Sequence, residues 1–558
     1  MISTWVFLYL AQATGTPEAE PAPVPSGMDL LYSDRVPFAP SGEPLIAIGL
    51  MAGQKRVVLR SLSAIRADFY EAGVLKRTTV RPNDTLAVTV MRAKPAARRT
   101  YVDLQGIGWG KRDKLDWAIA GWRARGYPGV EALEQGNVLG IGGRVLDNRE
   151  YRLVLPVASK LRAEELVAEV YDLFGTRAFI SQRIAQRPWG ELSVHVADAP
   201  VGTATSFVRL STQGDCIEVE NVEYGHGYSW HGFKNRQYRG ELYVVIDPDG
   251  QLAAVNLLGA ESLLPSVVPS EMFASSPPEA LKAQAVAARN QLFAKLGKRH
   301  HADPYHLCSE QHCQVYSGLT QEDPRATAAV NATSGEILFH DEALVDTVYS
   351  STCGGHTEDN DAVWGNDPDP ALRARPDFES SSREPHGIPA DRLQAWLEST
   401  PSTYCSRATK VTADKFRWQK AFSTVELQKI VDTHYPKTGV VRSVEIEERG
   451  RGGRAIGLTI IGEKSVATVV HELPIRKLFG NLNSGMFVIN ESRDDADKLT
   501  GVTFVGGGWG HGVGMCQLGA IGRAEAGHSY HDILSHYYNG SRVSRLYDTQ
   551  LKTLPQNH

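Results

Sequence analysis

The stretch SVVPSEMFASSPPEALKAQAVAARNQLFAKLGKRHHADPYHLCSEQHCQVYSG, residues 266–318, decides how the rest of the chain is interpreted. Its middle part is rich in Ala, Leu, Lys and Gln, which are strong helix formers. Ser276, followed by Pro277 and Glu279, predicts a helix start with a capping box, and Gly297 predicts the helix end. The apolar face that this helix is expected to bury comprises Leu281, Ala285, Ala288, Leu292 and Leu296.

Glu271 is a candidate general acid. We expect it on a short loop just before the helix, beside the apolar Met272 and Phe273. Apolar surroundings raise the pKa of a carboxyl group, as a general acid working near neutral pH requires. The alternative is an ordinary exposed glutamate on a surface loop.

A cluster of cysteine and histidine follows the helix. His306, Cys308, His312 and Cys313 are the predicted ligands of a structural zinc ion, because two thiolates and two imidazoles complete a tetrahedral site. Two further histidines, at 300–301, could also supply the fourth ligand. The alternatives are a Cys308–Cys313 disulfide and thiols without a partner.

Four separated motifs of this chain occur in one order that resembles the stage II sporulation protein D family (SpoIID/LytB) of bacterial cell-wall enzymes. The resemblance implies one catalytic glutamate, at Glu271, and a glycan cleft. The motifs are PSEMFASSPPEALKAQAVAARN at 269–290, HCQVYSG at 312–318, SSTCGGHTED at 350–359 and GGGWGHGVGMCQLGA at 506–520.

The same resemblance implies where substrate contacts lie. Tyr349 and His356 are expected near the cleft, and the glycine-rich turn is expected to bring His511 and Gln517 to its floor. Two cations of the helix are also predicted substrate contacts, Lys282 and Arg289, which lie seven residues apart on one face.

This chain departs from the family pattern at two places. Phe273 stands where the family usually has proline, and Asn290 and Gln291 stand where it has a Thr-Tyr pair. Neither departure removes the acid. Glu261 is expected to have a structural role, and Cys405 is a candidate partner of Cys353, although sequence alone does not fix cysteine connectivity.

Composition restricts the class of protein. With 558 residues, of which 42% are hydrophobic, the chain can bury a large core and is expected to hold two or more domains. The net charge of -5 gives no reason to expect a nucleic-acid partner. No apolar run long enough for an internal membrane span follows the N-terminus.

The predicted fold class is α+β: a mixed, β-rich catalytic domain with a few helices around a cleft, and a small inserted βαββαβ domain. In the insertion, strand–helix patterns that begin at Tyr101 and Tyr151 echo each other, a half-repeat that resembles the SPOR domain of glycan-binding proteins. The alternative is an ordinary insertion that packs on the core and binds nothing. The predicted divisions are a signal segment and tether at 1–27, first β segments at 44–98, the insertion at 99–185 and the main catalytic domain at 215–546.

We therefore expect an exported lytic transglycosylase of the periplasm or cell wall that cleaves peptide-stripped MurNAc–GlcNAc strands of peptidoglycan. A single carboxylate suffices for this reaction, because the attacking hydroxyl belongs to the substrate itself. An N-acetylmuramoyl-L-alanine amidase is an expected partner. Two alternatives stay open: a non-enzymatic, glycan-binding modifier of such an amidase, and a zinc hydrolase whose metal activates water.

Overall fold

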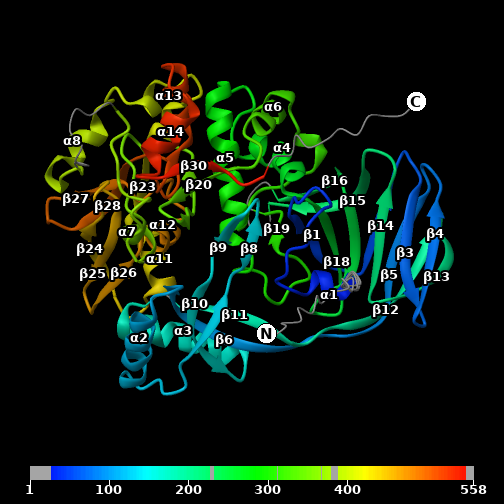
Figure 1. Cartoon of the computed structure of the whole chain (residues 1–558). Helices are drawn as coiled ribbons and strands as arrows, with labels where there is room; N and C mark the ends of the chain where they lie inside the picture. Colours follow the sequence, from blue (N-terminus) through cyan, green and yellow to red (C-terminus); the bar gives the residue numbers. More distant parts are fainter. Residues whose placement is uncertain are drawn as a thin grey trace, which may run out of the picture.

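The computed structural model describes residues 27–547 except 177, 226–230, 311, 366 and 379–386; nearly all of the predicted signal segment therefore lies outside the described residues. The fold is α+β, as predicted. Two β lobes flank a group of central helices, and the inserted unit lies beneath them in the view of Figure 1. None of the helices in the described ranges is long and apolar enough to cross a membrane.

The first lobe is a β-sandwich. Alternate residues of its two sheets, such as Leu59, Val88 and Val194 in one and Val208 and Val244 in the other, point inward and share one buried cluster. One sheet is ordered β19 (Leu307–Cys308), β1 (Leu45–Gln54), β18 (Leu252–Gly259), β17 (Glu241–Ile246), β14 (Phe207–Thr212), β3 (Ile65–Glu71) and β4 (Val74–Val80), and the other β13 (Ala199–Thr205), β12 (Trp189–Val196), β5 (Thr85–Lys94), β2 (Arg56–Arg60), β15 (Ile217–Tyr224) and β16 (Gly232–Tyr238).

The predicted helix is α5 (Pro278–Lys295), which occupies the centre of the molecule. Almost every side chain from Ala280 to Ala294 is buried, because neighbouring helices cover it on several sides. Its many alanines allow those helices to approach closely. The neighbours are α4 (Ala260–Glu271), α6 (Pro324–Ala332), α13 (Gln517–Glu525) and α14 (Tyr530–Tyr537).

The predicted capping box at the start of α5 is wrong. The N-cap is Pro277 in an extended conformation, and the Ser276 hydroxyl is buried without a hydrogen-bond partner. The cause is the second proline, Pro278, because a residue before proline is driven out of the helical region. Glu279 instead accepts hydrogen bonds from the Lys282 ammonium (2.7 Å) and the Tyr530 N–H (2.8 Å).

A second β lobe follows in the chain. Its two three-stranded sheets and two helices bury their own apolar cluster, which includes Leu458, Phe479, Phe487 and Phe504. The sheets are β23 (Arg417–Ser423), β28 (Leu499–Gly507) and β27 (Phe487–Arg493), and β24 (Val441–Arg449), β25 (Ala455–Gly462) and β26 (Val466–Val470); the helices are α11 (Thr424–His434) and α12 (Glu472–Leu478).

Short elements join the lobes. They include two small sheets and several short helices. These are β20 (Glu336–His340), β21 (Ala343–Leu344) and β30 (Arg542–Arg545); β22 (Tyr349–Ser350) and β29 (Met515–Cys516); and α7 (Asn360–Trp364), α8 (Leu393–Glu398) and α9 (Tyr404–Arg407).

The insertion contains the predicted order of strand, helix, strand, strand, helix, strand, with an additional β-hairpin between its second and third strands. Its main sheet is antiparallel, and both helices bury Trp122, Ala163 and Val170 against it. The flanking strands β5 and β12 pair with each other, so the insertion leaves and re-enters the sandwich at one place. The elements are β6 (Ala97–Gly108), α2 (Arg112–Ala124), β7 (Glu131–Gln135), β10 (Glu150–Val157), α3 (Lys160–Phe174) and β11 (Phe179–Gln186), in sheet order β11-β6-β10-β7.

A hairpin fastens the insertion to the central helices. Strands β8 (Val138–Ile141) and β9 (Arg144–Asp147) extend from it toward α5 (Figure 1). Their apolar side chains join the main core, and the Asn148 amide donates hydrogen bonds to the Phe293 and Leu296 carbonyls at the end of α5 (2.6 and 3.0 Å). The hairpin therefore packs the insertion against the core.

We expect Ile141→Ala to destabilise the whole chain. Ile141 is 3% exposed, and truncation of a buried isoleucine costs about 2–5 kcal/mol. Val145→Ala, in the same hairpin but 63% exposed, is the control and should change stability by less than about 0.5 kcal/mol. Thermal unfolding of both full-length variants measures the difference. Equal unfolding temperatures would show that the hairpin does not join the core in solution.

Candidate functional site

Glu271 is the last residue of α4 rather than part of a loop. Pro265 and Pro269 lie within this helix, and burial of its apolar face outweighs their effect. Met272 follows as the C-cap, and its N–H donates to the Val268 carbonyl (2.9 Å). The carboxyl group is thus attached to the end of a packed helix.

The surroundings of Glu271 favour its protonated form. Its side chain is half-buried, and burial raises the pKa of the carboxyl group. The Val315 N–H, which donates to Oε1 (3.4 Å), the Lys295 charge and the Tyr349 hydroxyl lower this pKa by less. The net shift is upward, as expected for a general acid.

Lys295, at the last position of α5, is the residue whose positive charge lowers the pKa of Glu271. Its ammonium group donates hydrogen bonds to the Gln291 side chain (2.9 Å) and the Cys313 carbonyl (2.6 Å). Burial lowers the pKa of Lys295. Sequence reasoning did not identify this residue as part of the site.

Tyr349 and Gln517 reach Glu271 from different segments. The Tyr349 hydroxyl bonds the Glu271 carboxyl group. The Gln517 amide donates to the Glu271 carbonyl (2.8 Å) and to the Gln284 side chain (3.2 Å). Parallel pairing of β22 with β29 places Tyr349 opposite Met515 and so brings these two segments together.

His511 lies beside Tyr349 in the glycine-rich turn. Its Nδ1 accepts a hydrogen bond from the Val513 N–H (3.0 Å), and the ring also forms a hydrogen bond with the Tyr349 backbone. The centroid of the Trp364 ring lies 5.1 Å from that of His511. Burial, together with the charges of Arg454 and Arg476, lowers the pKa of His511 to about 3. The imidazole is therefore neutral at physiological pH.

The structure does not bring the other predicted substrate contacts to this site. Arg289 is 0% exposed and pairs with Glu261 inside the core. His356 is buried, and its Nδ1 lies 2.8 Å from the Thr357 carbonyl oxygen. The Lys282 ammonium group pairs with Glu279 (2.7 Å) and lies over the Tyr530 ring, 5.6 Å from its centroid.

The residues that depart from the family pattern lie in the core. The Asn290 amide donates to the Leu338 and Val345 carbonyls (2.8 and 3.1 Å), and its oxygen accepts the Leu338 N–H (2.7 Å). Gln291 accepts from Lys295. These two side chains therefore fasten α5 to β20 and orient Lys295.

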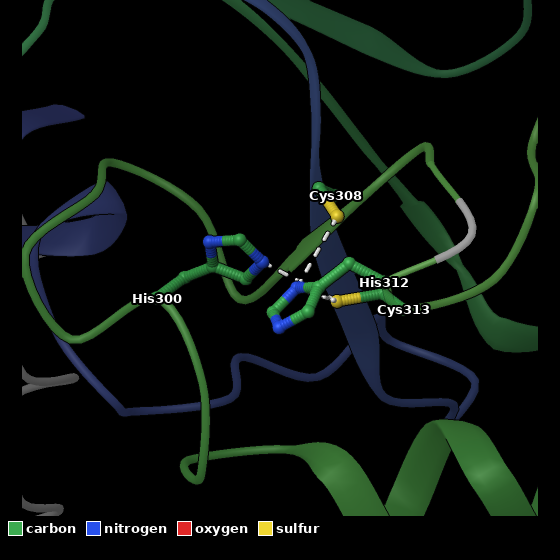
Figure 2. A group of neighbouring side chains, drawn as sticks. All are labelled: His300, Cys308, His312 and Cys313. Atoms are coloured by element: carbon green, nitrogen blue, oxygen red, sulfur yellow. Dashed lines mark hydrogen bonds between the residues drawn. The ribbon is translucent and has the colours of Figure 1, made fainter. Parts of the chain in front are cut away.

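Four side chains converge in a candidate metal centre (Figure 2). The ligating atoms of His300, Cys308, His312 and Cys313 all lie within 4.8 Å of one another. The other ring nitrogen of His300 bonds Asp303 (2.8 Å), an arrangement that orients metal-binding histidines. Two thiolates and two imidazoles fit a tetrahedral cation such as zinc.

The prediction of His306 as a ligand is wrong. Its Nδ1 accepts the Ala47 N–H (3.1 Å), and its Nε2 lies 3.1 Å from the Arg35 carbonyl oxygen. Both nitrogens are therefore taken by backbone groups that hold β19 against β1. His300, which the sequence offered as an alternative, occupies the fourth position.

Comparison with known proteins finds similarity to one family. A family model described as stage II sporulation protein matches residues 248–340, and a domain of unknown function matches residues 358–514. Stage II sporulation protein D of Bacillus subtilis is 28% identical over 52% of this chain and 76% of its own. These matches support the resemblance to the stage II sporulation protein D family.

Two other relatives extend the match. The amidase enhancer of Bacillus subtilis is 25% identical over 70% of this chain but only 56% of its own length. An uncharacterised protein of Brachyspira hyodysenteriae is 27% identical over 62% of this chain and 81% of its own. The match to the stage II sporulation protein model includes Glu271, Lys295 and the candidate metal centre, whereas Gln517 lies outside both matched ranges.

Replacement of the acid should make stability less dependent on pH. The folded pKa of Glu271 is raised, so its contribution to stability is present at low pH and is lost as the pH rises through that value. Glu271→Gln does not titrate, and its unfolding temperature relative to wild type should therefore increase from pH 4 to pH 8.

Glu279→Gln is the control with the opposite sign. Partial burial raises the pKa of Glu279, but Lys282 and the Tyr530 N–H lower it by more, so this variant should lose stability relative to wild type as the pH rises. Parallel pH profiles for the two variants would contradict the buried environment of Glu271.

Proposed function

We propose that this protein is a peptidoglycan lytic transglycosylase with Glu271 as its single acid and base. The observation that carries the proposal is a half-buried carboxyl group, of raised pKa, bonded by Tyr349 and the Val315 N–H.

The reaction requires two proton transfers at one carboxyl group. Protonated Glu271 donates its proton to the glycosidic oxygen between MurNAc and GlcNAc as the C1–O bond breaks. The resulting carboxylate accepts the proton of the MurNAc C6 hydroxyl, whose oxygen bonds C1 and closes a 1,6-anhydro ring. Atoms and charge balance without water, and the acid is regenerated.

The neighbours of Glu271 suit these steps. Tyr349 and the Val315 N–H orient the carboxyl group and stabilise the carboxylate after the first transfer, with help from the Lys295 charge. Neutral His511 and Gln517 lie on the glycine-rich segment beside them. We propose these two as contacts of the sugar hydroxyl groups.

The similarity to this family supports a substrate that lies in the cell envelope. The family's members include stage II sporulation protein D, and cell-wall glycan strands are the substrate class that the family resemblance implies. We propose that the chain acts outside the cytoplasm, in the periplasm or cell wall, on strands whose peptides an amidase has removed. We also propose that the insertion binds such strands, because its order of strands and helices resembles that of the SPOR domain.

A second candidate function is enhancement of an amidase without cleavage. The observation that favours it is the similarity to a relative named amidase enhancer. Release of 1,6-anhydro-muropeptides from peptide-free glycan by the purified protein separates the two, because a non-enzymatic modifier releases none. A zinc hydrolase is less consistent with the structure, because four protein ligands leave no open position for water.

We propose zinc as the cation of the centre formed by His300, Cys308, His312 and Cys313. The chain continues directly from Cys313 through Gln314 to Val315, whose N–H bonds Glu271. Zinc would therefore fix the loop that holds the acid. Its role would be structural, and no step of the reaction passes through it.

We expect Glu271→Gln to reduce release of anhydro-muropeptides by about 10²- to 10⁴-fold, the usual contribution of general acid–base catalysis. Binding to peptide-free glycan should persist, because the substitution keeps the shape of the side chain. Glu279→Gln serves as the control and should cleave at the wild-type rate. Unchanged cleavage by Glu271→Gln would overturn the assignment.

The ligand set makes a separate prediction. His300→Ala and Cys313→Ser should each lower the zinc content of the purified chain by about one equivalent and lower its unfolding temperature. His306→Ala should retain the metal although it weakens the contact between β19 and β1. Metal analysis by mass spectrometry measures this, and loss of zinc from His306→Ala alone would reverse the assignment.

A further inference from the structure

A second group of ligating side chains lies outside the site described above. Cys353, Cys405 and Cys516 converge with Asp377, and all four side chains are 0% exposed. Their ligating atoms lie within 4.8 Å of one another. They come from four separate segments: the turn after β22, the loop that precedes residue 379, helix α9 and strand β29.

We propose that these four residues form a second, closed zinc site. The Sγ atoms of Cys353 and Cys405 are 3.8 Å apart. Two thiolates bound to one zinc at ~2.3 Å in tetrahedral geometry are separated by about 3.8 Å, whereas a disulfide requires about 2.05 Å. Three sulfurs and one carboxylate complete four ligands.

The surroundings of the Cys516 sulfur favour a thiolate, the form of cysteine that binds metals. The Cys516 Sγ accepts the N–H groups of Cys353 (3.1 Å) and Gly519 (3.3 Å) and caps the N-terminus of α13. The Thr403 hydroxyl lies 3.3 Å from the Cys405 Sγ. Donated hydrogen bonds and a helix N-terminus both stabilise negative sulfur.

Asp377 is oriented as a ligand would be. Its Oδ1 accepts the Tyr537 hydroxyl (2.6 Å), and its Oδ2 accepts the Cys405 N–H (2.7 Å), which leaves lone pairs on both oxygens for a cation. Arg523 Nε lies 3.8 Å from Oδ1. Its charge offsets part of the net negative charge that three thiolates and one carboxylate leave around a divalent ion.

Two other states of these cysteines are conceivable. One is the Cys353–Cys405 disulfide that the sequence suggests, with Cys516 left as a thiol. The other is three protonated thiols packed as small apolar groups. The metal site accounts better for the structure, because all three sulfurs and the carboxylate face one point and Cys516 accepts two backbone N–H groups.

The experiment is metal analysis of the full-length chain purified in reductant. The wild type should hold about two zinc ions, and Cys313→Ser and Cys516→Ser should each retain about one. Cys216→Ser is the control and should keep both ions, because Cys216 belongs to neither group. A wild type with one zinc, or a Cys516→Ser chain that keeps two, overturns the proposal.

Wild-type protein provides a second measurement in case Cys516→Ser does not fold. After substitution of cobalt for zinc, thiolate-to-cobalt charge-transfer absorption should come from both sites, and Cys313→Ser should retain the part due to Cys353, Cys405 and Cys516. Absence of that absorption from Cys313→Ser overturns the site. So does a disulfide-linked peptide containing Cys353 and Cys405 in non-reducing digests of the wild type.

Discussion

The buried ion pair between Glu261 and Arg289 is the contact on which the candidate active site depends. Arg289 donates two hydrogen bonds to the Glu261 carboxylate (2.7 and 2.8 Å) and one to the Glu336 carbonyl (3.0 Å). The Tyr547 hydroxyl also bonds Glu261 (2.7 Å). Loss of one partner of such a pair typically costs about 3–5 kcal/mol, because it leaves an uncompensated charge in the core.

This ion pair sets the relation between two helices. Glu261 lies in the first turn of α4, which ends at Glu271, and Arg289 lies in α5, which ends at Lys295. The helix ends that carry the candidate acid and its nearby cation are therefore held by a rigid core rather than by loops. Such support preserves catalytic geometry, because small displacements of a reacting group reduce rates strongly.

Local sequence patterns predicted the elements better than their contacts. Helix α5 and the helix and strand pattern of the insertion follow from turn residues and periodicity. The choice between His300 and His306 depends on strand pairing between segments more than 250 residues apart, which spacing does not reveal. Arg289 shows the same limit, since a charged residue on a helix is usually exposed and its burial depends on Glu261.

Each of the two cysteine-containing groups lies close in sequence to a residue that contacts Glu271. The centre at Cys313 is two residues from Val315, whose N–H bonds the carboxyl group, and the group at Cys516 is one residue from Gln517, whose amide bonds the carbonyl of the same glutamate. Side-chain anchors next to both contacts restrict how far either can move. Because burial raises the pKa of Glu271 and an ionised carboxylate in that position is unfavourable, the surrounding structure must be held against relaxation and water entry. The two cysteine-containing groups lie next to the residues that contact Glu271 and do not contact its carboxyl group themselves. They can therefore hold the half-buried environment in place without adding a charge beside the acid.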